Sequence, residues 1–134
     1  MSKYDTNLAS EYYVLSMLYR LGIDAYLTLG SKKSVDILIN KNGALKTVDV
    51  KGIKGVTWWP LDNFSNRKSN HFLALVSYLN KIEDVSVIPE VYIVPAKDVD
   101  KLLWENPKKT RKGISLGNMR KAESKYRNKW SFLK

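Results

Sequence analysis

The stretch SVDILINKNGALKTVDVKG, residues 34–52, decides the fold because it predicts a β-hairpin. Its two runs, residues 35–39 and 44–50, are rich in the branched apolar side chains that favour strands. Asn42 and Gly43 between them are the strongest short-range signal for a two-residue type I′ turn, which needs a positive φ at both positions. We therefore expect two antiparallel strands joined by these two residues.

The predicted register brings two aspartates together. With Asn42 and Gly43 in the turn, Asp36 lies opposite Asp49, and the strand period of two puts Lys51 on the same face. The other face carries apolar residues that can form core, namely Val35, Ile37, Ile39, Val48 and Val50. Two like charges set opposite each other destabilise a hairpin. Either one carboxylate is protonated, a cation lies between them, or the register differs.

A helix is predicted before the hairpin. Asp5, Thr6 or Asn7 suits its N-cap, and Gly22 stands where a C′ glycine belongs. We expect an inward stripe of helical spacing made by Leu8, Tyr12, Leu15, Leu18 and Tyr19. Glu11 lies on or beside this stripe, where a carboxylate needs a partner unless its head reaches water.

The rest of the chain predicts further strands and helices of a single domain, residues 1–134. We expect strands at 24–29, 72–78 and 90–94, helices at 96–104 and 118–130, and a loop at 105–117. The segment 55–70 contains a proline and two adjacent tryptophans, so a loop, a short helical turn and an extended flap all stay open.

Composition narrows the class of protein. The absence of cysteine excludes disulfides, thiolate metal sites and a cysteine nucleophile. The apolar runs are too short to cross a bilayer and no secretory signal precedes them, so we expect a cytoplasmic protein without a membrane partner.

The net charge of +10 is concentrated in the C-terminal segment. Residues 1–106 carry 13 Lys and Arg against 12 Asp and Glu, whereas residues 107–134 carry 10 against one. Tyr126, Trp130 and Phe132 are interleaved with these cations. This pattern suits a polyanion such as a nucleic acid, because phosphate neutralisation and planar stacking surfaces occur together. The alternative is a solvated charged face.

The order of acidic residues resembles the PD-(D/E)XK nuclease superfamily, which has the restriction-endonuclease-like fold. The match consists of Glu11 in the first helix, Asp36 in the first hairpin strand, and Asp49-Val50-Lys51 in the second. Softer similarity to small prokaryotic members of the family lies at residues 59–61, 89–95 and 126–130. Val35 stands where the family name has proline, and residues 55–70 are poor material for the helix usual there.

The resemblance implies an α/β fold with a central mixed sheet flanked by helices, and an Mg²⁺-dependent endonuclease that hydrolyses DNA. It gives Glu11, Asp36 and Asp49 the role of metal ligands, with Mn²⁺ able to substitute, and Lys51 the role of assisting the attacking water. A homodimer would suit a cut through two strands. The rival hypothesis is a non-catalytic nucleic-acid-binding module of the same fold, a subunit of a repair or defence complex. A domain whose basic segment docks an acidic protein is a third.

Several residues near the proposed site are candidates for DNA contact. Phosphate contacts are expected from the loop and flanking cations Lys32, Lys33, Lys54, Arg67 and Lys68, although each is as readily explained as a solvated charge. Trp58 and Trp59 could cap the core, or they could stack on an unpaired base or wedge a distorted duplex. His71 is the only histidine, with a structural role or a contact to substrate as the alternatives.

Overall fold

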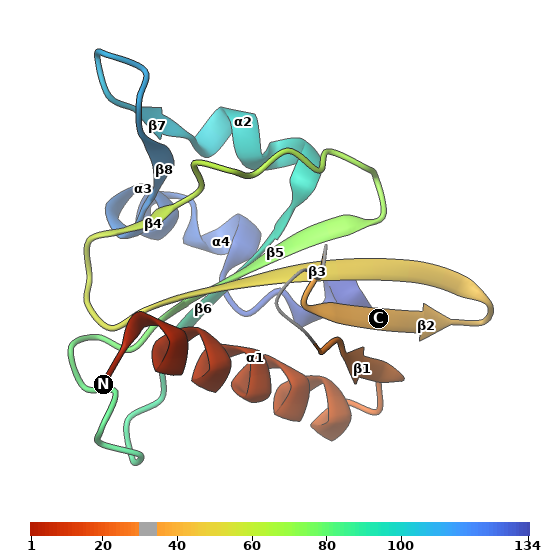
Figure 1. The fold of residues 1–134 in the computed structure, drawn as a ribbon. Helices are drawn as coiled ribbons and strands as arrows, with labels where there is room; N and C mark the ends of the chain where they lie inside the picture. Colours follow the sequence, from red (N-terminus) through yellow and green to blue (C-terminus); the bar gives the residue numbers. More distant parts are fainter. Residues whose placement is uncertain (30–34) are drawn as a thin grey trace.

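A five-stranded mixed sheet lies between two layers in the computed structural model, which describes residues 1–29 and 35–134 (Figure 1). The strand order is β1-β2-β3-β5-β6, with only β3 and β5 parallel among neighbours. The strands are β1 (Ala25–Leu27), β2 (Ile37–Lys41), β3 (Ala44–Ile53), β5 (His71–Ser77) and β6 (Glu90–Pro95). The α/β class with a mixed sheet flanked by helices is therefore confirmed.

The hairpin has the predicted turn and register. Asn42 and Gly43 have φ values of 52° and 85°, as a type I′ turn requires. The ladder runs from Lys41 opposite Ala44 to Ile37 opposite Val48. β3 is longer than predicted because its other edge pairs in parallel with the whole of β5.

Helix α1 (Lys3–Arg20) packs on the first face of the sheet. Ser2 is its N-cap and forms a capping box with Asp5, so the predicted caps at residues 5–7 were wrong, whereas Gly22 has the expected positive φ of 73°. The buried residues of the helix are Thr6, Ser10, Glu11, Val14 and Leu18. In the predicted stripe Leu18 is buried and Leu15 packs half-buried against the core, but Tyr12 and Tyr19 are exposed, so the prediction was wrong for the tyrosines. The small residues Thr6 and Ser10 face the closely packed sheet instead.

The second face is covered by a small sheet and short helices. The sheet has the order β4-β8-β7, built from β4 (Trp58–Pro60), β8 (Lys112–Ser115) and β7 (Trp104–Glu105). The helices are η1 (Ala96–Asp98), α2 (Val99–Leu102), α3 (Leu116–Lys121) and α4 (Glu123–Tyr126), and η2 (Trp130–Leu133) follows them. The loop predicted at 105–117 is confirmed for residues 106–111 but was wrong at Glu105 and from Lys112 onward, and the helices predicted at 96–104 and 118–130 were too long. These short elements depend on pairing with distant residues, which local sequence does not disclose.

Two apolar cores result, one on each side of the sheet. The α1 side is filled by residues such as Val14, Ile37, Val48 and Val50, which confirms the predicted apolar face of the hairpin apart from half-buried Val35. On the other side, buried Trp59 donates its indole N–H to the Val76 carbonyl at 3.0 Å.

Within residues 1–29 and 35–134, the structure contains no helix with the length and apolarity to span a bilayer.

Gly52→Ala should destabilise the protein, because α1 lies directly on β3 at this position. An added Cβ would lie 1.9 Å from the Ser10 Oγ and 3.2 Å from the Thr6 carbonyl oxygen. We expect the free energy of unfolding to fall by about 1–3 kcal/mol in urea titrations. Gly117→Ala is the matched control, since its nearest contact would be 4.0 Å and alanine favours helix α3. Equal stability of the two variants would contradict this packing.

The buried Glu90 should make stability depend on acid pH. The Glu90 carboxylate accepts hydrogen bonds from the Arg120 guanidinium at 2.6 Å and from the Tyr92 hydroxyl at 2.8 Å. The Arg120 contact holds the pKa of Glu90 below its usual range. A carboxyl group with a lowered pKa stabilises the fold at pH values above its pKa in the unfolded chain. This stabilisation is lost as the pH falls through its pKa in the folded protein. Arg120→Gln should therefore destabilise the protein at pH 7 more than at pH 3. Lys125→Gln, which removes an exposed cation of α4, is the matched control and should show almost no such pH dependence in thermal unfolding.

Candidate active site

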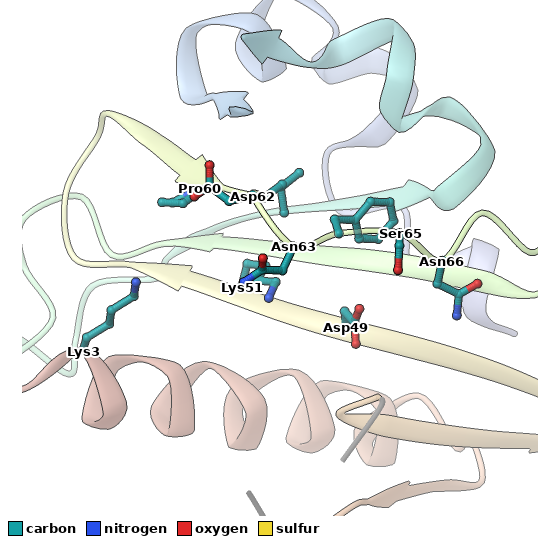
Figure 2. A pocket seen from close by; sticks show the side chains of 10 residues that line it. Lys3, Asp49, Lys51, Pro60, Asp62, Asn63, Ser65 and Asn66 are labelled. Carbon is teal, nitrogen blue, oxygen red and sulfur yellow. The ribbon is translucent and has the colours of Figure 1, made fainter. Parts of the chain in front are cut away.

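Asp49 and Lys51 lie on the face of β3 that points away from α1. Their apolar neighbours Val48 and Val50 belong to the core under the helix, so alternation sends the two charged side chains to the opposite side. There they line a cavity of about 270 Å³. Figure 2 shows them on β3 below the loop that carries Asn63, with Lys3 at the start of α1.

Asp36 lies where β2 has not yet begun to pair with β3. The ladder stops at Ile37 and Val48, so the predicted pairing of Asp36 with Asp49 falls one step beyond it. The Asp36 backbone N–H donates to the Val48 carbonyl at 3.0 Å, and its Oδ2 accepts the Val50 backbone N–H at 2.8 Å. The carboxylate therefore satisfies a backbone donor of β3 at the point where its neighbouring strand is missing.

A second cavity of about 560 Å³ is lined by Glu11, Asp36 and Lys51. Glu11 is only 7% exposed on the inner face of α1. Lys51 lines both cavities, whereas Asp49 lines the first and Asp36 the second. The structure thus brings the four predicted residues to two adjoining cavities that share one lysine, and neither cavity is lined by all four.

His71 connects Asp49 to the adjacent strand. Its Nε2 lies 3.2 Å from the Asp49 Oδ2, and its Nδ1 lies 2.7 Å from the Thr47 Oγ1. The histidine is fully buried, with its ring stacked on Phe64 at a centroid distance of 6.0 Å. This burial excludes a direct contact with substrate and makes His71 an orienting partner of Asp49. Only the parallel register that sets Thr47 beside His71 discloses this role, and no local pattern predicts that register.

The donor chemistry of the site fits a hard cation. Asp36 and Asp49 offer carboxylate oxygens, and Mg²⁺ is commonly held in proteins by one or two carboxylates together with waters and substrate phosphates. In the part of the chain that the structure describes, no three His, Cys, Asp or Glu side chains form a ready metal-binding group.

The predicted DNA contacts differ in how far they are engaged within the protein. The Lys54 ammonium donates to the Met1 carbonyl at 2.8 Å. Arg67 pairs with Asp100 at 3.0 Å and lies over the Phe64 ring, whereas Lys68 is exposed. Trp58 is half-buried on the small sheet. The predicted contacts Lys32 and Lys33 lie outside the described residues.

Comparison with known proteins finds similarity among solved structures. No protein-family model matches the chain, and neither does any curated protein. Among solved structures, the chain is similar to a bacterial homing endonuclease, I-Ssp6803I, with a TM-score of 0.47 and 20% sequence identity. The similarity covers 71% of this chain and 66% of the endonuclease, just under two thirds of its length.

Proposed function

We propose that this protein is an Mg²⁺-dependent endonuclease that hydrolyses phosphodiester bonds of DNA. The observation that carries the proposal is the position of Lys51, which lines both the cavity of Asp49 and the cavity of Glu11 and Asp36. A cation between acidic residues, next to a carboxylate that is oriented by a buried histidine, supplies the groups that phosphodiester hydrolysis needs.

Lys51 and the acidic residues have separate tasks in this proposal. Lys51 holds a nonbridging phosphate oxygen or positions the attacking water, since its ammonium group has three donors and no acceptor. Asp36 and Asp49 hold Mg²⁺, which when bound supplies Lewis-acid stabilisation of the charge that develops on the phosphate. Both carboxylates are fixed before substrate binds, Asp36 by the Val50 N–H and Asp49 by His71. Glu11 lies beside Asp36 and completes the acidic side of the second cavity.

The protein should nick supercoiled plasmid DNA in the presence of Mg²⁺ or Mn²⁺, and EDTA should abolish the nicking. Asp49→Asn and Lys51→Ala should each lower the rate about a hundredfold or more, because the first weakens the proposed metal site and the second removes the cation that faces the reacting phosphate. Asp84→Asn and Lys97→Ala, which change exposed residues away from both cavities, are the matched controls and should cut at the wild-type rate.

A DNA-binding assay distinguishes a nuclease from a non-catalytic nucleic-acid-binding module. Wild type and both site variants should retain labelled DNA in a mobility-shift assay, whereas only the wild type cuts. If plasmid, single-stranded and branched DNA all stay intact with wild type and are bound equally by every variant, the protein is a nucleic-acid-binding module and the nuclease proposal is wrong.

His71→Phe should reduce activity through Asp49 while the core stays filled. We expect kcat to fall about 10- to 100-fold and the Mg²⁺ concentration for half-maximal rate to rise, with KM for DNA unchanged. His71→Gln should recover part of the loss, because its amide can donate to the carboxylate. Val99→Ala, a buried change in the same core that lines neither cavity, is the control for packing and should lower thermal stability without changing the Mg²⁺ requirement. A Mg²⁺ requirement that stays the same in folded His71→Phe would show that the histidine serves packing alone.

A further inference from the structure

The outer face of the small sheet carries two tryptophans side by side. Trp58 and Trp104 come from its two edge strands, and their rings meet edge to face with centroids 5.5 Å apart. Trp104 is 48% exposed, whereas Trp59, the next residue after Trp58, is fully buried in the core below. The two rings are large apolar surfaces that the fold leaves at the solvent side.

Gly113 of the central strand β8 makes this arrangement possible. A Cβ at this position would lie 2.3 Å from the Trp58 ring and 2.3 Å from the Trp59 carbonyl oxygen. Any other residue would displace the ring or the backbone, so the glycine allows the Trp58 ring to lie across the sheet. The position of the Trp58 ring therefore depends on the absence of a side chain at residue 113.

The two rings line an open hollow of about 400 Å³, within the size range of small-molecule sites. Its remaining lining consists of the polar residues Thr57, Ser115 and Asn118. Flat apolar rings with polar groups around them match a nucleobase, which has a π-face and hydrogen-bonding edges.

Charge around the hollow favours a nucleic acid over an apolar peptide or a lipid. The turn between β7 and β8 contains Lys108, Lys109 and Arg111 without an acid, and the Asn106 side chain fixes its shape by accepting the Thr110 and Arg111 backbone N–H groups. Stacking rings next to backbone-binding cations are the usual elements of single-strand recognition.

Arg111 connects this face to the candidate active site. Its guanidinium lies 5.2 Å from the centroid of the Trp58 ring and donates to both carboxylate oxygens of Asp62 at 3.1 Å. Asp62 and Pro60 line the cavity of Asp49 and Lys51, so the far end of β4 borders that cavity while Trp58 borders the hollow. The Lys112 backbone N–H and then Arg111 hold the pKa of Asp62 below its usual range, which keeps this link ionised.

We infer that the Trp58–Trp104 face stacks an unpaired base of the nucleic acid strand that occupies the active site. This inference rests on the proposed function and specifies its substrate as DNA with a single-stranded or unstacked part next to the scissile bond. A fully paired duplex keeps its bases stacked inside and cannot fill the hollow without distortion.

The test measures binding apart from cleavage. Protein carrying Lys51→Ala is titrated into fluorescein-labelled duplex DNA, a single strand, and a duplex with a single-stranded flap, while tryptophan emission is recorded. We expect the flap and the single strand to bind more tightly than the duplex and to quench emission. Adding Trp104→Ala should weaken binding of the flap about five- to tenfold without changing binding of the duplex, and Trp104→Phe should retain most of the preference.

Tyr19→Ala, which removes an exposed aromatic residue from α1, is the matched control and should change none of these affinities. Circular dichroism and thermal unfolding establish that each variant is folded. Equal affinity for flap and duplex, or a folded Trp104→Ala that binds the flap as tightly as its parent, would overturn the inference. Mg²⁺-dependent nicking by wild type would then still support the nuclease function. Conversely, a Trp104-dependent preference for the flap without any cleavage would support the stacking site and contradict the proposed nuclease function.

Discussion

The structure depends on β3 being longer than its partner β2. At Thr47 and Val48 the strand is paired on both edges, but from Val50 onward β2 offers no backbone acceptor. A buried N–H without a partner costs free energy comparable to a lost hydrogen bond. The Asp36 carboxylate accepts that N–H, and Asp36, Val50 and Lys51 all line the second cavity. The missing strand partner at Val50 therefore positions a carboxylate at the candidate site.

Both layers of the fold contribute to the proposed chemistry. α1 brings Glu11 to the sheet because small residues let the helix approach β3 at Gly52. On the other face, β5 places His71 against Asp49, and the loop after β4 forms the wall of the first cavity. The C-terminal basic segment is mostly part of this second layer rather than a separate tail, since it supplies β8, α3 and α4. Three of its cations, Lys108, Lys109 and Arg111, lie in the turn between β7, which carries Trp104, and β8.

Local signals in the sequence predicted the hairpin and its register, because Asn42-Gly43 fixes turn type and alternation fixes the faces. The two long buried strands were also predictable from continuous apolar runs. The inward face of α1 was not, since tyrosines matched the helical period while the packed face used Thr6 and Ser10. The small sheet was missed because strands of two to four residues carry little local signal and are held by pairing between segments about fifty residues apart. The contact of His71 with Asp49 depends on the parallel register of β3 and β5, which only the fold reveals.

Because the Asp36 carboxylate accepts a backbone hydrogen bond of β3, this aspartate would remain useful to a chain that had lost all catalytic ability. Its presence in a divergent copy of this fold would be poor evidence that the copy is an active enzyme. The Lys51 side chain lines both cavities and accepts no backbone hydrogen bond of the sheet. Its presence or absence in a related chain would therefore say more about catalytic activity than that of Asp36. Lys51 is thus a better indicator of catalytic activity than Asp36, which also serves the fold.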